Sequence, residues 1–359
     1  MSGNKKTIVH VIDRLHAGGA ERVLTMQANL FYENGHHVKV VTTVSSGPLR
    51  ELLNKDILFE CLNRKWKWSP ATMYRLVKAI KNFDVVHVHS SHNLRYVFLA
   101  MKLFFLKKKI FFQEHSGKIH VNKYVSPDRK YIYPKVFVIC VSDEIAKWAK
   151  EDVGVPASQV FVLPNIIVKE DVPQKEKEIT DKIKLVLVSN FVPSKNIEFA
   201  VMLLHKLIDD GGKYSLTITG LIADKEYYQK IMQLIKENNL EEDVKIISDC
   251  LHVQAILHQY DLAIHTTSYE SGPLVLIEYM AQGLLFLTYN TGQVVEIIKP
   301  AMPGCIVSSF DMEEWKIKIE SITNSDKMQV QKKMQEIFES FFSAEKYYET
   351  CNQIYDSCV

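Results

Sequence analysis

The sequence predicts an α/β protein of two domains, each built on a parallel sheet that helices cover on both faces. Strand-like apolar runs alternate with helical patterns along the whole chain, which is typical of βαβ units. The strand candidates are almost continuously apolar, as expected where both faces of a sheet are buried. The chain has 359 residues, more than one core usually holds, and a charged segment at 168–182 separates two such series.

The first domain, residues 1–167, contains strand candidates rich in Val, Ile and Phe. After the first of them, helical periodicity runs through Glu21–Asn34, and Gly35 ends that helix. The apolar stretch Arg95–Leu106 is a further helix candidate. The strand candidates are Lys6–Asp13, His37–Thr43, Asp84–Ser90, Lys109–Ser116, Lys135–Ser142 and Gln159–Asn165.

The second domain, residues 183–343, repeats the alternation after the linker at 168–182. Helices are expected at Asn196–Ile208 and Lys225–Asn238, and the C-terminal segment 344–359 also has a helical pattern. The strand candidates are Lys184–Asn190, Tyr214–Gly220, Asp243–Ser248, Asp261–Thr267 and Leu284–Tyr289.

The composition is that of an ordinary globular protein, with 47% hydrophobic and 24% charged residues. No apolar run reaches the roughly 18 residues that a membrane span needs. The N-terminus passes from a short polar lead into a strand, without the apolar region of a signal peptide. Six scattered cysteines include no Cys-x-x-Cys pair, which argues against a disulfide framework or a zinc site. We therefore expect a cytoplasmic protein.

The net charge of +2 conceals an asymmetry between the two halves. Residues 1–168 contain 25 Lys and Arg against 13 Asp and Glu, whereas the remainder contains 19 against 29. A first half of charge +12 favours an anionic partner, such as a membrane surface, a lipid-linked diphosphate or a nucleic acid. Evolutionary drift of surface charge in two solvated domains explains the charge difference between the halves equally well.

The most informative segment is 268–283, SYESGPLVLIEYMAQG. Its Gly272-Pro273 pair ends a loop and opens a helix over Leu274–Ala281, with Pro at or near the first helical position. The N–H groups of that first turn suit the diphosphate of a nucleotide. Glu270 precedes the helix and Glu278 lies about one and a half turns into it, so two carboxylates reach one ligand. Carboxylates accept hydrogen bonds from paired sugar hydroxyls.

This segment resembles the E-x7-E signature of the family 4 retaining glycosyltransferases, which use nucleotide diphosphate sugars. The resemblance extends over nearly the whole chain and implies the GT-B fold, two Rossmann-like domains facing each other across a cleft. It implies that Glu278 binds the donor ribose and that Glu270 lies against the donor sugar. It also assigns donor binding to the start of the helix, at Gly272, Pro273, Leu274 and Val275.

Two motifs of the first domain match the same family. Gly18-Gly19, after the first strand, resembles the glycine loop that faces the donor diphosphate and the acceptor. Adjacent glycines let a backbone approach a ligand closely, although a tight turn needs them too. His115, at a strand end, resembles the histidine that contacts the donor sugar hydroxyls. His87, His89 and His92 look like a metal cluster, but no carboxylate accompanies them, and we expect a wall of the cleft there.

Lys195 follows the first strand of the second domain and resembles the family's diphosphate-binding lysine. The family usually has Gly and Arg ahead of it, whereas this chain has Ser189 and Asn190. The missing guanidinium removes a bidentate contact worth up to about 3 kcal/mol. Either another cation replaces it or donor binding is weaker, and Asn190 stays a donor-binding candidate. Thr291-Gly292-Gln293 matches the family's closing loop more loosely.

The resemblance implies transfer of a sugar from a UDP- or GDP-sugar to a glycan or lipid-linked acceptor, with retention of configuration. By family frequency the setting is bacterial cell-surface polysaccharide assembly. Catalysis would fall to Lys195, Glu270 and His115. The sequence has no Asp-x-Asp motif, so we expect no metal. The family resemblance implies neither another cofactor nor a nucleic-acid partner. The first domain would bind the acceptor and the second the donor, and the segment 344–359 would pack back on the first domain.

Two segments mix basic with apolar residues, Val97–Lys109 and Asn63–Trp68. Both suit an anionic membrane surface, which would place the protein at the inner face of the cell membrane. The alternatives are a helix packed on the sheet with solvated lysines at its end, and an ordinary exposed loop.

Other functions are weighed against the transferase. A Rossmann oxidoreductase fits poorly, because the first turn reads HAGGAER and the second strand ends in Thr42-Thr43 without an acidic residue. A nucleotide-sugar epimerase of the same two-domain architecture stays open. A non-catalytic relative that only binds a nucleotide sugar also stays open, and the missing arginine makes this alternative more plausible.

Overall fold

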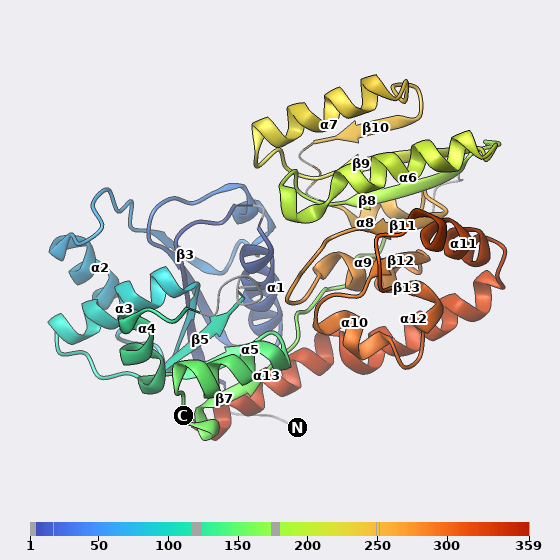
Figure 1. Ribbon diagram of the computed structural model, residues 1–359. Helices are drawn as coiled ribbons and strands as arrows, with labels where there is room; N and C mark the ends of the chain where they lie inside the picture. The colour runs from blue at the N-terminus through green and yellow to red at the C-terminus, as the bar shows by residue number, and fades with distance from the viewer. Residues whose placement is uncertain are drawn as a thin grey trace. The chain divides into compact units, whose positions relative to one another are not determined.

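The computed structural model describes residues 5–16, 18–115, 124–173, 180–248, 250 and 252–358. Ala17 of the glycine turn, Ser116 of a predicted strand, residues 174–179 of the predicted linker and Val359 lie outside the described residues. The chain forms two units, Met1–Ile166 with Ala344–Val359 and Ile167–Ser343 (Figure 1). Each unit is described by itself below.

The first unit contains a parallel sheet whose described strands follow the order β3-β2-β1-β4-β5-β6-β7. Val, Ile and Phe side chains from its strands are buried against the helices that cover them. The strands are β1 Thr7–Ile12, β2 His37–Thr42, β3 Leu58–Cys61, β4 Val85–His89, β5 Ile110–Glu114, β6 Phe137–Cys140 and β7 Val160–Val162.

Two helices of the first unit, α2 Pro70–Ile80 and α5 Asp143–Trp148, begin after a serine cap. Ser69 caps α2, because its hydroxyl accepts a hydrogen bond from the Thr72 N–H and Pro70 is the first helical residue. Ser142 caps α5 in the same way. The helices are α1 Gly19–Glu33, α2 Pro70–Ile80, α3 Ser91–Leu103, α4 Pro127–Ile132, α5 Asp143–Trp148 and α13 Ala344–Cys358.

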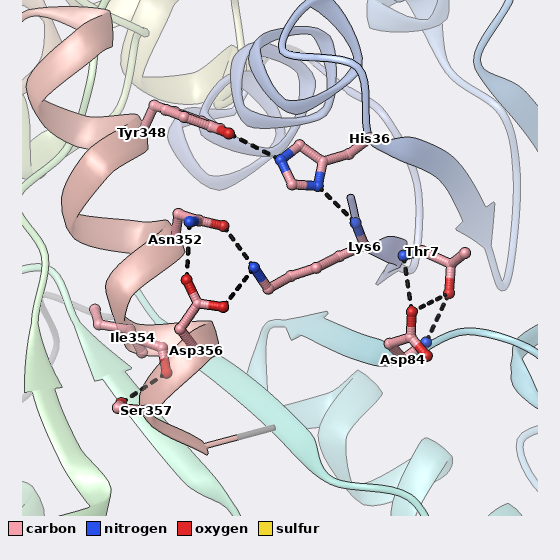
Figure 2. A network of polar contacts seen from close by, with 9 residues as sticks. All are labelled: Lys6, Thr7, His36, Asp84, Tyr348, Asn352, Ile354, Asp356 and Ser357. Carbon is pink, nitrogen blue, oxygen red and sulfur yellow. Dashed lines mark hydrogen bonds and ion pairs between the residues drawn. The ribbon is translucent and has the colours of Figure 1, made fainter. Parts of the chain in front are cut away.

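The C-terminal helix α13 belongs to the first unit. Lys6 Nζ donates to Asn352 Oδ1 at 2.9 Å and pairs with the Asp356 carboxylate at 2.7 Å (Figure 2). His36 Nε2 lies 2.9 Å from the Tyr348 hydroxyl. Because the Lys6 side chain is only 7% exposed, Asp356 compensates a nearly buried charge. The apolar stripe of α13 is Tyr347, Cys351, Ile354, Tyr355 and Cys358.

The second unit contains a parallel sheet whose described strands follow the order β10-β9-β8-β11-β12-β13. With parallel sheets and covering helices in both units, the predicted fold class is confirmed. The strands are β8 Ile183–Val188, β9 Tyr214–Thr219, β10 Val244–Ile247, β11 Leu262–His265, β12 Phe286–Tyr289 and β13 Ile306–Val307. The helices are α6 Ile197–Asp209, α7 Lys225–Glu237, α8 Gln254–Leu257, α9 Leu274–Gln282, α10 Gln293–Ile298, α11 Met312–Thr323 and α12 Lys327–Phe341.

Each sheet has one topological switch point, where the strand order turns from one direction to the other. It lies between β1 and β4 in the first sheet and between β8 and β11 in the second. Ligands of open parallel sheets bind outside the carboxyl ends of strands at such points. The loops that follow β1, β8 and β11 contain Gly18, Lys195 and Glu270, respectively. Within the described residues, no helix is long and apolar enough to cross a membrane.

Candidate functional site

The structure brings two predicted site residues together at the switch point of the second sheet. Lys195 ends a 3₁₀ turn after β8, and its ammonium forms an ion pair with the Glu270 carboxylate in the loop after β11. Both side chains are about a quarter exposed, so a ligand can reach them. Thr266 fixes this arrangement, because its hydroxyl donates to the Lys195 carbonyl at 3.0 Å.

The loop that carries Glu270 is held by the segment Thr291-Gly292-Gln293. The Thr291 hydroxyl accepts a hydrogen bond from the Glu270 N–H at 2.9 Å, and the Gln293 N–H donates to the Ser271 carbonyl at 2.9 Å. Gly292 has a φ of +84°, and a Cβ there would lie 2.9 Å from both the Glu270 carbonyl oxygen and Pro273 Cδ. Glycine therefore permits a close approach that positions Glu270.

Helix α9 starts directly after this loop. Pro273, expected at or near the first helical position, is the residue before the helix, and Leu274 is the first residue of α9. The backbone N–H groups of Leu274 and Val275, in the first turn, have no partner within an α-helix and suit an anion. Glu278 lies further along α9 and is 5% exposed, and Gly272 lies in the loop before it.

Asn190 occupies the position where the family resemblance leads one to expect arginine. Its side-chain oxygen accepts a hydrogen bond from the Leu221 N–H at 3.1 Å, which ties the loop after β8 to the loop after β9. The close packing of these loops requires Gly220, because a Cβ there would lie 2.1 Å from the Ser189 carbonyl oxygen. The amide oxygen of Asn190 is therefore committed to the protein, and its NH₂ group is the part suited to a phosphate.

His265 lies beside this site and was not singled out from the sequence. It ends β11 and is 1% exposed, with Nδ1 2.9 Å from the Thr288 hydroxyl. Burial, together with the nearby Lys195 ammonium, lowers the pKa of His265 to about 3. The neutral imidazole therefore adds no second positive charge beside the Lys195 ammonium. The only signal in the sequence is a histidine inside an otherwise apolar strand.

In the first unit, Gly18 and Gly19 form the turn into α1. Gly18 is the N-cap, and the Arg22 N–H donates to its carbonyl at 3.0 Å. The Glu21 carboxylate folds back over Gly18, at 2.3 Å from where a Cβ would stand. Burial raises the pKa of Glu21, and a hydrogen bond from its own backbone N–H opposes this. An acidic side chain at the start of α1 makes this turn less suited to a phosphate than the start of α9.

The histidines of the first unit are arranged differently from the sequence expectation. His92 is exposed on α3 and takes no part in a cluster with His87 and His89. Instead His10 of β1 joins them, since it pairs with His87 across the sheet. The nitrogens of these three buried residues lie within 4.8 Å of one another, a group that could hold a metal ion. His115 follows β5, and its Nε2 lies 3.3 Å from His89 Nδ1.

Two models of glycosyltransferase families match this chain. The model of "Glycosyl transferases group 1" matches residues 168–337, and that of "Glycosyltransferase Family 4" matches residues 17–170. The two matches together extend over both units. The chain belongs to the family 4 glycosyltransferases.

Individual members of the family are only distantly similar to this chain. N-acetyl-alpha-D-glucosaminyl L-malate synthase of Bacillus anthracis is 24% identical over 311 residues, which are 80% of each chain. The GPI3 subunit of phosphatidylinositol N-acetylglucosaminyltransferase from Saccharomyces cerevisiae is 24% identical over 174 residues. That match spans 46% of this chain and 38% of the yeast subunit.

A solved glycosyltransferase-like structure shows the same fold. HepE of Anabaena, crystallised in complex with UDP and glucose, has a TM-score of 0.82 and 16% identity. The alignment covers 98% of this chain and 100% of HepE. The GT-B fold expected from the resemblance is thereby confirmed.

Proposed function

We propose that this family 4 glycosyltransferase moves a sugar from a nucleotide diphosphate sugar to a glycan or lipid-linked acceptor, with retention of configuration and without a divalent metal. The observation that carries the proposal is the Lys195–Glu270 ion pair at the switch point of the second sheet, next to the start of α9. One cation and one helix N-terminus there suit the diphosphate of a nucleotide sugar, and two carboxylates suit its hydroxyl groups. The complex of HepE with UDP and glucose supports uracil as the base to test first.

In this proposal the second unit binds the donor. Lys195 and the first-turn N–H groups of α9 bind the diphosphate, while Asn190 offers its NH₂ group. Glu278 accepts hydrogen bonds from the ribose hydroxyls and Glu270 from the sugar hydroxyls. A diphosphate competes with Glu270 for the Lys195 ammonium, so donor binding frees the carboxylate to accept from the sugar.

The protein assists the chemical step by stabilising the leaving group. The bond between the anomeric carbon and the diphosphate oxygen breaks while the acceptor oxygen bonds to the same face of that carbon. The leaving diphosphate takes the proton of the acceptor hydroxyl. Negative charge grows on the diphosphate, and donors that are already fixed, here Lys195 and the start of α9, stabilise it without reorganisation.

The first unit contributes Gly18, Gly19 and His115. Burial lowers the pKa of His115 to about 4, so this residue is a neutral imidazole near pH 7. It is therefore suited to a hydrogen bond with a sugar hydroxyl rather than to a charge contact with the diphosphate.

The proposed acceptor side rests on exposed aromatic and basic residues of the first unit. Phe105 is 90% exposed after α3, and Trp66 is 78% exposed before α2. Beside Phe105 lies an open cavity of about 470 Å³ lined by apolar side chains and five lysines, Lys102, Lys107, Lys108, Lys109 and Lys135. Aromatic rings with lysines favour an anionic bilayer surface. We place the protein in the cytoplasm, on a membrane that presents a lipid-linked acceptor.

Calorimetric titration with UDP, GDP, ADP and their sugars tests donor binding. One nucleotide is expected to bind the native protein, and Glu278→Gln is expected to weaken it by about ten- to a hundredfold, because a charge-assisted hydrogen bond to ribose is lost. Glu198→Gln is the control, since Glu198 is a carboxylate on another helix of the second unit, α6, where it pairs with Lys230 at 3.0 Å. Equal binding by Glu278→Gln and the native protein would remove the assigned donor site.

An assay of the reaction products distinguishes the proposed transferase from an epimerase and from a non-catalytic relative. Release of the nucleoside diphosphate only when an acceptor glycan or glycolipid is present identifies a transferase. An epimerised sugar formed without any acceptor identifies an epimerase. Tight nucleotide-sugar binding with neither reaction identifies a non-catalytic relative.

A further inference from the structure

His265 has a buried nitrogen without a partner beside the candidate donor site of the second unit. The residue ends β11, and its side chain is 1% exposed. Its Nδ1 lies 2.9 Å from the Thr288 hydroxyl on the neighbouring strand β12, whereas its Nε2 has no hydrogen-bond partner within the described part of the chain. A buried polar atom without a partner costs free energy and therefore calls for an explanation.

The contacts of Thr288 determine which nitrogen of His265 carries the proton. Burial and the nearby Lys195 ammonium lower the pKa of His265 to about 3, so near pH 7 the ring has one donor and one acceptor nitrogen. The single hydrogen of the Thr288 hydroxyl is donated to the Tyr289 carbonyl at 3.0 Å, so this hydroxyl can only accept from His265. The opposite tautomer would lose one of these bonds and bury an N–H without an acceptor, which is rare in proteins. His265 Nε2 is therefore a bare acceptor.

The bare nitrogen faces the side of the sheet on which Lys195 lies. The two nitrogens of an imidazole point in nearly opposite directions, so Nε2 of His265 points away from β12. Strand β11 lies between β12 and β8, and Lys195 follows β8. Two hydrogen bonds join the loops after β8 and β11, from the Ser268 N–H to the Ser194 carbonyl at 3.1 Å and from the Thr266 hydroxyl to the Lys195 carbonyl at 3.0 Å.

Burial also limits which donor can reach His265. Because its Nε2 is buried, a nucleotide sugar does not contact this atom directly. The Lys195 side chain can approach it from within the protein, since an ammonium on a flexible four-carbon stem has three N–H donors. In the structure that ammonium pairs with Glu270. A bound diphosphate would compete with Glu270 for the ammonium and so free Lys195 for a different partner.

We infer that His265 is a positioning residue whose Nε2 accepts a hydrogen bond from the Lys195 ammonium once a nucleoside diphosphate has displaced Glu270. The inference rests on the proposed function for its ligand, but the tautomer of His265 does not. The other N–H groups of Lys195 then point to the diphosphate oxygens. A neutral acceptor suits this task, because it orients the ammonium without cancelling the positive charge that binds the diphosphate.

Nitrogen-15 NMR of the imidazoles tests the inference without a ligand or an assay of activity. His265, assigned by the signals that His265→Phe lacks, is expected as the Nδ1–H tautomer. Glu270→Ala frees the Lys195 ammonium, so the Nε2 resonance of His265 is expected to move to lower frequency, as that of a bare nitrogen does on accepting a hydrogen bond. Glu198→Ala, which removes a carboxylate from α6, is expected to leave it unchanged. An Nε2–H tautomer in the native protein, or an unmoved resonance in Glu270→Ala, would overturn the inference.

A double-mutant cycle measured by calorimetry tests whether His265 acts through Lys195. His265→Phe is expected to raise the Kd of the nucleoside diphosphate that binds, among UDP, GDP and ADP, by about fivefold in the native background. In the Lys195→Met background the same change is expected to alter Kd by no more than about twofold, because the residue on which it acts is gone. The control is His258→Phe, since His258 precedes β11 and its Nδ1 is also buried without a partner in the described part of the chain. It is expected to change Kd in neither background.

The two measurements separate this inference from the proposed function. If none of the three nucleotides binds the native protein, the proposed function fails, while the NMR of Glu270→Ala still decides whether Lys195 pairs with His265. If a nucleotide binds but His265→Phe weakens it equally with and without Lys195, donor binding stands and the positioning role of His265 is lost.

Discussion

The position of Glu270 depends on a single glycine that follows in the next loop. Gly292 holds a left-handed φ of +84°, and its missing side chain lets the backbone of residues 270–273 approach. Hydrogen bonds of the Thr291 hydroxyl and of the Gln293 N–H also hold the loop that contains Glu270. A carboxylate that must accept from one particular sugar hydroxyl needs this precision, because small displacements cost binding energy and rate.

Gly292→Ala is expected to weaken nucleotide-sugar binding as well as stability. A Cβ adds left-handed strain of about 1–2 kcal/mol and must also displace the Glu270 carbonyl and Pro273. The matched control is Gly211→Ala, because Gly211 has a φ of +86° but no atom within 4 Å of the added Cβ. Thermal unfolding should show a loss in both variants, whereas calorimetry should show weaker donor binding only in Gly292→Ala. Equal donor affinity in the two variants would contradict the role given to Gly292.

At the residue scale, the sequence predicted the charged residues of the candidate site better than the residues that hold them in place. Glu270 and Lys195 were recognised from a motif, and the structure pairs them. The contact of Asn190 with Leu221 was not predictable, because it joins loops 31 residues apart. The contacts of His89 with His10 and with His115 were also missed. One histidine in an apolar strand carries no sign of the residue that will face it on a neighbouring strand.

At the scale of elements, long buried strands were predictable and short edge elements were not. Each strand candidate overlaps a strand of the structure, although β8 begins at Ile183, one residue before its candidate. Near-continuous apolar runs have few alternatives to a buried sheet. The strand β3 was missed, since it has four residues, lies at the sheet edge and is only half-buried. The strand β13 has two residues. Helix α2 was not predicted, although Ser69-Pro70 is a recognisable helix start.

The end of α3 and the loop after it carry the proposed membrane contact. Phe105→Asp combined with Lys107→Glu is expected to reduce binding to vesicles of anionic phospholipid at least tenfold. The change removes an exposed ring and reverses a charge, and each lysine near such a surface contributes about 1 kcal/mol. Vesicle flotation at low salt measures the binding, with neutral vesicles as the reference.

A variant of the second unit provides the control for that experiment. Met328 is 78% exposed on α12, so Met328→Asp places a charge on another exposed apolar position. It is expected to leave vesicle binding unchanged. Equal flotation of the Phe105 variant and the Met328 variant, or native binding to neutral vesicles as strong as to anionic ones, would exclude this face as the contact.

At the scale of the whole molecule, each unit buries a histidine that cannot take up a proton while folded. Burial lowers the pKa of His10 and of His265 to about 3, against about 6.5 in an unfolded chain. Between these values the unfolded state binds more protons, so the free energy of unfolding falls as the pH drops below 6.5. Each such histidine costs about 2 kcal/mol of stability between pH 7 and pH 5.

Proton uptake on unfolding measures this effect even if the two units unfold separately. At pH 5.5, transfer into urea is expected to take up nearly one proton for each of His10 and His265, while most carboxylates stay ionised in both states. His265→Asn keeps a side chain that can bond to Thr288 but cannot titrate, so it should lower the uptake by about one proton. It should also flatten the loss of stability of the second unit below pH 6.5. An uptake unchanged by this substitution would mean that His265 is protonated in the folded protein, and that the site beside Lys195 carries a second positive charge.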